Sequence, residues 1–357
     1  MRIVFDVSPL SHERTGVGNY VLGSLGGLVE AAADDHEVVA WAPASRAGRA
    51  AIERALHGLD VERRLPVLPF AHAWRTAWSR AAAPPVERFV GGFDVLHFSD
   101  WMYPPQADGV RSTMIHDLVP LRFPDWTHRK TVRMHGAKYR NAARTCDLLF
   151  TNSEFTARDT ERLLGVEPER LRVAHPGLDP RYTAEGERAE LGRRYVLTAA
   201  TLEPRKNLGT LVDAHALLGG THALAVAGGP GWGAQTLPER DGVVRLGFVR
   251  HEDLPRWYRG AEVFVFPSRF EGFGMPVVEA MACATPCVVS SHPSLDEACG
   301  DAAIRVDPES AEEMAAGIER ALAERDELVR RGLDHARAFT WRRAGEIMLE
   351  AYAEAAA

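Results

Sequence analysis

The stretch Ser268–Ala280 constrains the fold more than any other part of this chain. The residues just before it, Val263–Phe266, are apolar and β-prone, which predicts a buried parallel strand. Pro276 favours the first turn of a helix, because its missing N–H removes no hydrogen bond there. Two glycines lie between, so backbone amides can approach a ligand closely, and a helix dipole favours a phosphate at such a turn. The sequence therefore predicts a strand, an anion-binding turn and a helix in succession.

Two glutamates flank this predicted anion site, Glu271 in the turn and Glu279 in the helix. Carboxylates on both sides of a phosphate suit a sugar nucleotide, which carries hydroxyls at both ends and phosphates between. The alternative is an ordinary strand–turn–helix with two solvated glutamates, but the apolar Phe-Gly-Met-Pro between them argues against it. We assign five residues here to binding of the nucleotide sugar: Glu271, Phe273, Gly274, Met275 and Glu279.

This Glu-x7-Glu pattern, together with Glu-Pro-Arg-Lys-Asn at Glu203–Asn207, resembles the retaining glycosyltransferases of family 4. The resemblance implies the α/β GT-B fold, with two Rossmann-like doubly wound domains facing a cleft and a C-terminal helix that crosses back to the N-terminal domain. It also implies a nucleotide-sugar donor. No Asp-x-Asp lies at the end of a predicted strand, and Arg205, Lys206 and helix amides can stabilise the charge, so we expect no metal ion and no cofactor. The Ile-His-Asp-Leu segment after Met114 looks most like bacterial mannosyltransferases of polysaccharide assembly.

Length and composition are consistent with such a fold. A chain of 357 residues fits two domains, and the net charge of −7 argues against nucleic acid as a partner. No run reaches the roughly 18 apolar residues of a membrane span. Cys283 and Cys287 are spaced like metal ligands, but no histidine or cysteine cluster accompanies them, so we expect buried thiols in a reducing cytoplasm.

Strands alternate with helical patterns along the whole chain, which predicts doubly wound domains. We expect strands at Ile3–Val7, Glu37–Trp41, Val95–Phe98, Arg111–Ile115, Leu148–Thr151, Tyr195–Ala199, Ala223–Ala227, Val243–Leu246, Val263–Phe266, Cys287–Ser290 and Ala303–Val306. The periodicity lapses between Pro176 and Arg194. We therefore predict a domain boundary there, between residues 1–178 and 179–340. The resemblance implies that the first is the acceptor-side domain, completed by a crossover helix at 341–357, and that the second binds the nucleotide sugar.

Arg205 and Lys206 follow the predicted strand Tyr195–Ala199. Arginine offers a planar donor fork and lysine a point charge, so the pair suits a diphosphate and can stabilise it as it leaves. The alternative is a solvated basic pair at a helix start. We predict that Arg205 and Lys206 bind the donor and take part in catalysis, together with Glu271.

Two further loops of the second half follow strands. Gly229 lies in Gly228–Gly231, where glycines allow a tight turn beside a ligand. The family resemblance implies that Phe248 and Val249 lie against the nucleobase. Plain connecting loops are the alternative for both segments.

His116 and Asp117 come at the end of a predicted first-half strand. The resemblance implies a histidine near the anomeric carbon at this point, so His116 is a candidate to hydrogen-bond the donor sugar or support its oxocarbenium-like transition state. Asp117 is a candidate to orient the imidazole or bind the acceptor. A lone histidine is more often structural, which is the alternative.

Gly16 and Gly18 lie in Thr-Gly-Val-Gly-Asn-Tyr after the first strand. The segment fails as a dinucleotide fingerprint, because Val21 occupies the third glycine position. The resemblance implies a glycine-rich loop that closes on the donor diphosphate. A flexible turn is the alternative.

Two first-half stretches, Pro124–Arg144 and Arg63–Arg88, mix basic residues with aromatic ones. The basic residues of the first stretch include Lys130 and Lys138. Against a negative total charge they suggest an anionic surface, such as the inner membrane face or a lipid-linked acceptor. The alternative, which we favour, is a solvated helix face with core aromatics.

We therefore expect a metal-independent, retaining hexosyltransferase acting on a saccharide or lipid-linked acceptor. GDP-mannose is the first donor candidate and a UDP-sugar the second. Two other classes remain as alternatives: a sugar-nucleotide 2-epimerase, and a non-catalytic sugar-nucleotide binder. The presence of His116 and Glu271 argues against the binder, and the pairing of both motifs argues against the epimerase.

Overall fold

The structure is a computed structural model that describes residues 1–12, 15–33, 35–81, 83–99, 102–229, 231 and 237–357. Its contacts divide the chain into two compact units. Unit 1 contains residues 1–118, 133–177 and 339–357, and unit 2 contains residues 119–132 and 178–338. The sequence analysis grouped residues 119–132 with the first domain. In the structure they cluster with unit 2, where the Phe123 ring packs edge-on against Phe270 at 5.3 Å.

Unit 1 is built on a parallel sheet with the strand order β3-β2-β1-β4-β5-β6-β7. This is the order of a doubly wound sheet, which reverses direction between β1 and β4. The strands are β1 (Arg2–Asp6), β2 (Glu37–Trp41), β3 (Glu62–Arg64), β4 (Val95–Phe98), β5 (Val110–Ile115), β6 (Leu148–Thr151) and β7 (Leu171–Val173). The sequence analysis missed β3 and β7, which have three residues each and lie at the sheet edges.

Unit 2 repeats the same topology with the order β10-β9-β8-β11-β12-β13. Its strands are β8 (Tyr195–Ala199), β9 (Ala223–Ala227), β10 (Val243–Gly247), β11 (Val263–Phe266), β12 (Cys287–Ser290) and β13 (Ala303–Val306). All were predicted from the sequence. Of these strands, β10 is a half-exposed edge strand. This sheet reverses direction between β8 and β11.

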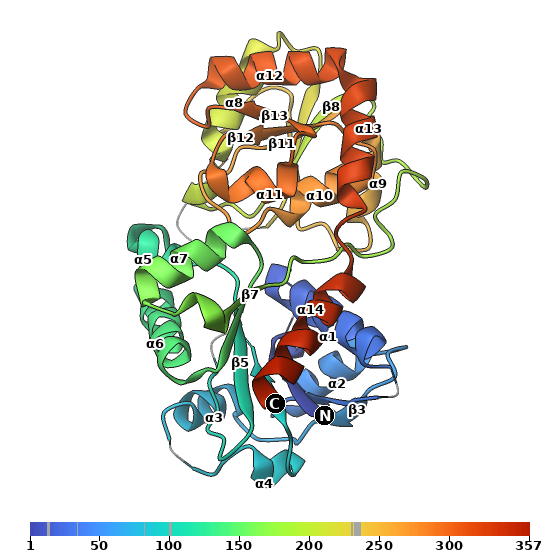
Figure 1. The fold of residues 1–357 in the computed structure, drawn as a ribbon. Helices are drawn as coiled ribbons and strands as arrows, with labels where there is room; N and C mark the ends of the chain where they lie inside the picture. The colour runs from blue at the N-terminus through green and yellow to red at the C-terminus, as the bar shows by residue number, and fades with distance from the viewer. Residues whose placement is uncertain (13–14, 34, 82, 100–101, 230, 232–236) are drawn as a thin grey trace. The chain divides into compact units, whose positions relative to one another are not determined.

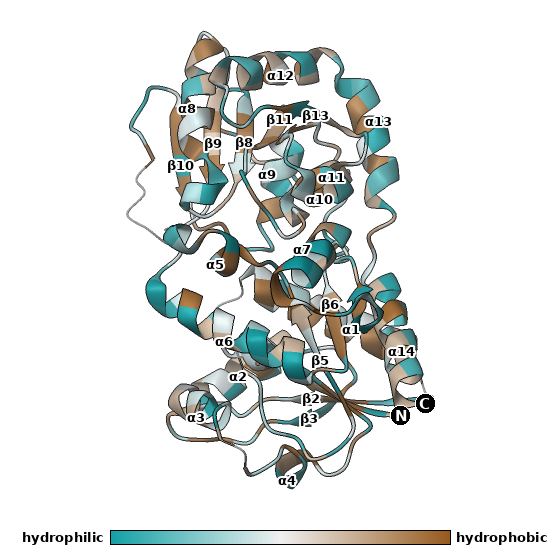
Figure 2. Cartoon of the chain, turned by 60° about the vertical axis from the view of Figure 1, so that its left-hand side comes forward, coloured by the Kyte–Doolittle hydropathy of each residue, from teal (hydrophilic) through white to brown (hydrophobic). Residues whose placement is uncertain are grey.

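Helices cover both faces of each sheet (Figure 1). The helices are α1 (Gly16–Ala32), α2 (Arg46–Ala55), α3 (Ala71–Trp78), α4 (Glu87–Val90), α5 (Val119–Arg122), α6 (Arg129–Thr145), α7 (Glu154–Leu164), α8 (Leu208–Leu217), α9 (Leu254–Gly260), α10 (Met275–Ala282), α11 (Asp296–Cys299), α12 (Ala311–Ala323), α13 (Arg325–Ala336) and α14 (Trp341–Ala356). Hydrophobic residues concentrate on the strands and on the helix faces toward them, as Figure 2 shows. Among the described residues, no helix is both long and apolar enough to cross a membrane.

The last helix, α14, packs in unit 1 against α1, which confirms the predicted crossover. The two backbones approach so closely that a Cβ on Gly27 would lie 1.8 Å from the Trp341 carbonyl oxygen. At its other end, the Tyr352 hydroxyl lies 2.9 Å from Nδ1 of the buried His97. The C-terminal helix is therefore part of the core of unit 1.

Candidate active site

The predicted donor residues lie where open α/β sheets bind ligands. In unit 2, the chain leaves β8 and β11 on the two sides of the point where the strand order reverses. Loops at the carboxyl ends of two such strands meet at one edge of the sheet, which is the usual ligand position. Arg205 and Lys206 lie in the short 3-10 turn after β8, and Glu271 lies in the turn after β11.

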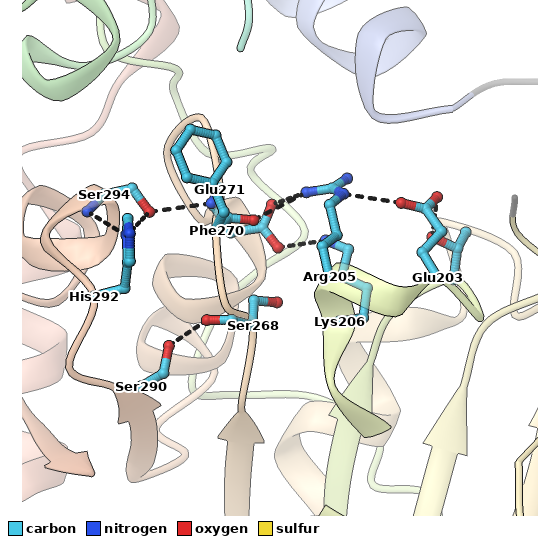
Figure 3. A network of polar contacts seen from close by, with 10 residues as sticks. Glu203, Arg205, Lys206, Ser268, Phe270, Glu271, Ser290, His292 and Ser294 are labelled. Carbon is cyan, nitrogen blue, oxygen red and sulfur yellow. Dashed lines mark hydrogen bonds and ion pairs between the residues drawn. The ribbon is translucent and has the colours of Figure 1, made fainter. Parts of the chain in front are cut away.

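These two turns are joined by an ion cluster (Figure 3). Glu271 accepts a hydrogen bond from Arg205 Nη1 through Oε2 and another from Lys206 Nζ through Oε1, both at 2.6 Å. On its other side Arg205 Nε donates to Glu203 Oε2 at 2.9 Å. Lys206 is 8% exposed and Glu271 is 7% exposed. The interpretation of Arg205 and Lys206 as a solvated pair is therefore wrong for Lys206.

The ion cluster holds Glu271 ionised. Burial alone would raise the pKa of this carboxyl, but the charges of Arg205 and Lys206 outweigh burial and lower the pKa to about 2. Burial lowers the pKa of Lys206, and the neighbouring Arg205 charge lowers it further, while Glu271 opposes both effects. The carboxylate thus pairs with two closely spaced cations at once.

The turn that carries Glu271 is fixed by side chains from the next strand and loop. Ser294 Oγ accepts a hydrogen bond from the Glu271 backbone N–H at 3.0 Å, and Ser290 Oγ donates to the Ser268 carbonyl. Gly274 caps α10 with a φ of +107°, and a Cβ there would lie 2.6 Å from a Leu295 methyl carbon. Only glycine fits this position without displacement. Met275 follows as the first residue of α10, as the sequence predicts for the helix start.

Glu279 lies within α10 in a different environment. It is 8% exposed, and its Oε2 accepts a hydrogen bond from the Tyr258 hydroxyl at 2.9 Å. Burial raises the pKa of Glu279, while His251 and the hydroxyls of Tyr258 and Tyr182 act in the opposite direction. This carboxylate is therefore surrounded by hydroxyl donors, whereas Glu271 is surrounded by cations.

The loops predicted to face the nucleobase lie after β9 and β10. A Cβ on Gly229 would lie 3.9 Å from Phe248 Cβ, so these two loops are neighbours. Phe248 is 58% exposed, and Val249 is half-buried. Pro230, within the predicted glycine turn, lies outside the described residues. Phe273 differs from Phe248 in being buried.

In unit 1, His116 and Asp117 follow the end of β5, as predicted. The ring of Tyr20 packs edge-on against the His116 ring at 4.9 Å. Burial lowers the pKa of His116 to about 3, with contributions from the charges of Lys138 and His135. His116 is therefore a neutral imidazole at neutral pH, which can both donate and accept a hydrogen bond.

Gly16 and Gly18 do not lie in a loop. They form the first turn of α1, with Thr15 at the N-cap position. The sequence analysis placed them in a loop because they follow the first predicted strand and because the family resemblance implies a glycine-rich loop there. Glycine is unfavourable in a helix. Packing of α1 against α14 stabilises the helix in spite of this. Gly16 is open to the surroundings, because a Cβ there would meet no atom within 4 Å.

Two family models match this chain. The model "Glycosyltransferase Family 4" matches residues 15–182, and the model "Glycosyl transferases group 1" matches residues 193–324. The chain belongs to the family 4 glycosyltransferases. The recognition made from the two motifs is thereby confirmed.

Individual relatives agree with this assignment. O-antigen chain mannosyltransferase B of Escherichia coli is 29% identical, with 99% of each chain covered. A D-inositol 3-phosphate glycosyltransferase of Acidothermus cellulolyticus is 32% identical over 59% of this chain and 54% of that enzyme. Among solved structures, HepE of Anabaena in complex with UDP-glucose superposes with a TM-score of 0.69 at 16% identity, covering 99% of this chain and all of the other. The glycosyltransferase WaaG superposes with a TM-score of 0.63 at 15% identity, covering 95% and 94%. These structures confirm the GT-B fold.

The basic stretches of this glycosyltransferase are only partly at the surface. Lys138, counted above with the basic face of Pro124–Arg144, is 2% exposed. Arg75 and Trp78 of the other stretch are 3% exposed. Hydrophilic residues do lie along α6, as Figure 2 shows, and Lys130 is exposed. A solvated helix face with buried aromatics therefore describes these stretches better than a continuous basic patch.

Three polar residues of the site escaped the sequence analysis as site residues. Glu203 was quoted as part of a motif, but nothing in its position indicates that it pairs with Arg205. Tyr258 is 21 residues before Glu279, in α9, and no local pattern connects them. Ser294 is 23 residues after Glu271. Only the doubly wound topology brings Tyr258 to Glu279 and Ser294 to Glu271, so sequence spacing carries no signal for these two residues.

Proposed function

We propose that the protein is a retaining, metal-independent hexosyltransferase that moves mannose from GDP-mannose to a hydroxyl of a saccharide or lipid-linked acceptor. The observation that supports this best is the ion cluster of Arg205, Lys206 and Glu271 at the switch point of unit 2. It offers two cations for a diphosphate and a carboxylate for sugar hydroxyls. The preference for mannose rests on the similarity to O-antigen chain mannosyltransferase B.

The cations serve catalysis in this proposal. When the bond between the sugar and the diphosphate breaks, negative charge develops on the leaving phosphate. Arg205 and Lys206 stabilise that charge, which lowers the barrier without a metal ion. Gly16 and Gly18, in the first turn of α1, supply backbone amides on the acceptor side.

In the proposal, the anomeric configuration of the sugar is retained because the acceptor hydroxyl attacks from the same face that the diphosphate leaves. Glu271 is ion-paired with two cations, which makes it a poor nucleophile. We therefore assign no covalent sugar–enzyme intermediate. The leaving phosphate accepts the proton of the acceptor hydroxyl, and neutral His116 hydrogen-bonds the donor sugar. Asp117 contacts the acceptor or orients His116.

Binding of the nucleoside is assigned to Glu279, Phe248 and Val249. Glu279 accepts hydrogen bonds from the ribose hydroxyls, and the other two residues lie against the base. A ribose is common to GDP-mannose and UDP-sugars, so a UDP-sugar is the alternative donor. The four cysteines are buried and unpaired, which supports a reducing cytoplasm as the location. A lipid-linked acceptor would place the enzyme peripherally at the inner membrane face.

The test is release of nucleoside diphosphate from a panel of labelled nucleotide sugars. GDP-mannose, UDP-glucose and UDP-N-acetylglucosamine are each incubated with the protein and a saccharide acceptor. We expect GDP and labelled acceptor with GDP-mannose. UDP release would select the alternative donor class. Conversion of the sugar while it stays on the nucleotide would indicate an epimerase, and binding without turnover would indicate a non-catalytic binder. The variant Lys206→Met serves as the negative control and Lys130→Met as its matched exposed counterpart.

A further inference from the structure

Helix α6 buries a lysine beside the strand end that carries His116. Lys138 is 2% exposed, and its Nζ donates a hydrogen bond to the Met114 carbonyl at 2.8 Å. Met114 lies in β5, two residues before His116. Burying an ammonium group costs several kcal/mol of solvation free energy. An unbranched apolar residue such as methionine would fill a similar volume without this cost, so the lysine requires an explanation.

The next residue of α6 holds the other side of the same segment. Tyr139 is 4% exposed, and its hydroxyl donates to the Asp117 carbonyl at 2.9 Å. His135, one turn earlier in α6, places Nδ1 3.3 Å from the same hydroxyl. Two successive residues of one helix thus fix the backbone carbonyls that flank His116.

The imidazole ring is held from a third element. Tyr20 of α1 packs edge-on against it, and the Tyr20 hydroxyl donates to the Ala174 carbonyl at 3.1 Å. The ring of Trp341 packs edge-on against Tyr20 at 5.4 Å. Helix α6 therefore holds the backbone on both sides of His116, and α1 holds its ring. A change in α6 that moves this backbone alters the position of the ring relative to the rest of unit 1.

We propose that Lys138 and Tyr139 are positioning residues for transfer: they fix the His116 segment, and Lys138 supplies a buried positive charge beside the imidazole. The proposal rests on the proposed role of His116 at the donor sugar. A displacement of about 1 Å in a reacting group costs on the order of 10²-fold in rate, so a backbone clamp of this kind matters for turnover.

The charge of Lys138 has a chemical consequence for His116. A nearby cation disfavours the imidazolium form, and together with burial this keeps the ring neutral. A neutral imidazole can accept a hydrogen bond from a sugar hydroxyl, which an imidazolium cannot. Among the described residues of unit 1, the groups around this ring include Lys138 and His135 from α6, His97 from β4, Tyr20 from α1 and the adjacent Asp117.

The test compares three single variants of the full chain. Lys138→Met removes the amine and keeps the length, and Tyr139→Phe removes one hydroxyl. Lys130→Met makes the same chemical change at an exposed position of the same helix. We expect kcat to fall about 10- to 100-fold in Lys138→Met and less in Tyr139→Phe, with the donor KM changed less than about threefold. Lys130→Met should match the wild type.

A double-mutant cycle with His116→Ala separates positioning from general damage. If Lys138 acts through His116, then Lys138→Met should change kcat less than about twofold in the His116→Ala background. An undiminished loss in that background would overturn the proposal, as would a wild-type kcat for Lys138→Met.

An NMR measurement of the His116 ring tests the positioning role without depending on turnover. It can therefore fail or succeed independently of the proposed function. The histidine ring signals of His116 are assigned by NMR through their loss in His116→Ala. We expect them to shift in Lys138→Met and Tyr139→Phe and to stay in place in Lys130→Met. Shifted signals in a protein that transfers no sugar would refute the proposed function alone, and unshifted signals would refute the positioning role.

Discussion

Replacing Glu271 by glutamine tests the energetics of the ion cluster directly. The pKa of this carboxyl is lowered from 4.5 to about 2 in the folded protein. Each pKa unit corresponds to about 1.4 kcal/mol, so the difference of about 2.5 units contributes about 3.5 kcal/mol to folding at pH 7. The carboxyl is 7% exposed, so solvent screening is weak. Glu271→Gln should lower the free energy of unfolding by about this amount.

The pH dependence of the loss follows from the direction of the pKa shift. A carboxyl whose pKa is lowered on folding stabilises the protein fully above its unfolded pKa of about 4.5. That contribution declines as the pH falls through the folded pKa of about 2. The difference between wild type and Glu271→Gln should therefore be about 3.5 kcal/mol at pH 7 and about 1.4 kcal/mol at pH 3.

Urea unfolding at both pH values measures this difference, and Glu309→Gln is the matched control. Glu309 pairs with Arg269 in the same region, but its side chain is 62% exposed, so its loss should cost less than about 1 kcal/mol. A Glu271→Gln cost no larger than that of Glu309→Gln at pH 7 would refute the reasoning. So would a cost that does not change between pH 7 and pH 3.

Four further predictions concern binding and turnover. Glu279→Ala should weaken binding of GDP and UDP by about 1.5–3 kcal/mol in titration calorimetry, because it removes the acceptor for the ribose hydroxyls; unchanged affinity would exclude that role. Arg205→Ala should lower kcat more than it weakens nucleoside binding, since its charge matters most as the diphosphate leaves; normal turnover would contradict the assignment. Activity should persist in EDTA, and loss restored by manganese would contradict metal independence. His116→Ala should lower kcat by a factor on the order of 10²–10⁴ with little change in melting temperature; a destabilised variant with normal turnover per folded molecule would make His116 structural.

The strands that are buried at every position are predicted with their observed bounds, whereas the half-exposed β10 is predicted one residue short. In unit 2, Val263–Phe266 and Cys287–Ser290 are buried at every position, and their bounds match the prediction. Edge strands carry a weaker signal. Glu62–Arg64 consists of charged residues, which an edge strand tolerates because it can expose side chains on both faces. No apolar run marks this strand in the sequence.

Within the site, the sequence predicts residue types and strand-end positions but not partners. Arg205 and Glu271 are 66 residues apart, and only the strand order β8-β11 makes them neighbours. Lys138 shows the limit most clearly. In a stretch rich in arginine and lysine it has the pattern of a solvated face, and its burial depends on where β5 ends relative to α6. Local sequence contains no information on that packing.

The two glutamates of the motif differ in a way that fixes the proposed orientation of the donor. The charges of two cations lower the pKa of Glu271 and keep it ionised. Glu279 is surrounded by tyrosine hydroxyls, and burial raises its pKa. A ribose is uncharged and offers hydroxyl donors, so it suits the second environment. A diphosphate needs the cations of the first. In the reverse orientation the diphosphate would lie beside a buried carboxylate that has a histidine near it in place of the arginine and lysine, so its repulsion would be less well compensated. The electrostatics therefore favour ribose at Glu279, diphosphate at Arg205 and Lys206, and the sugar on the side of Glu271.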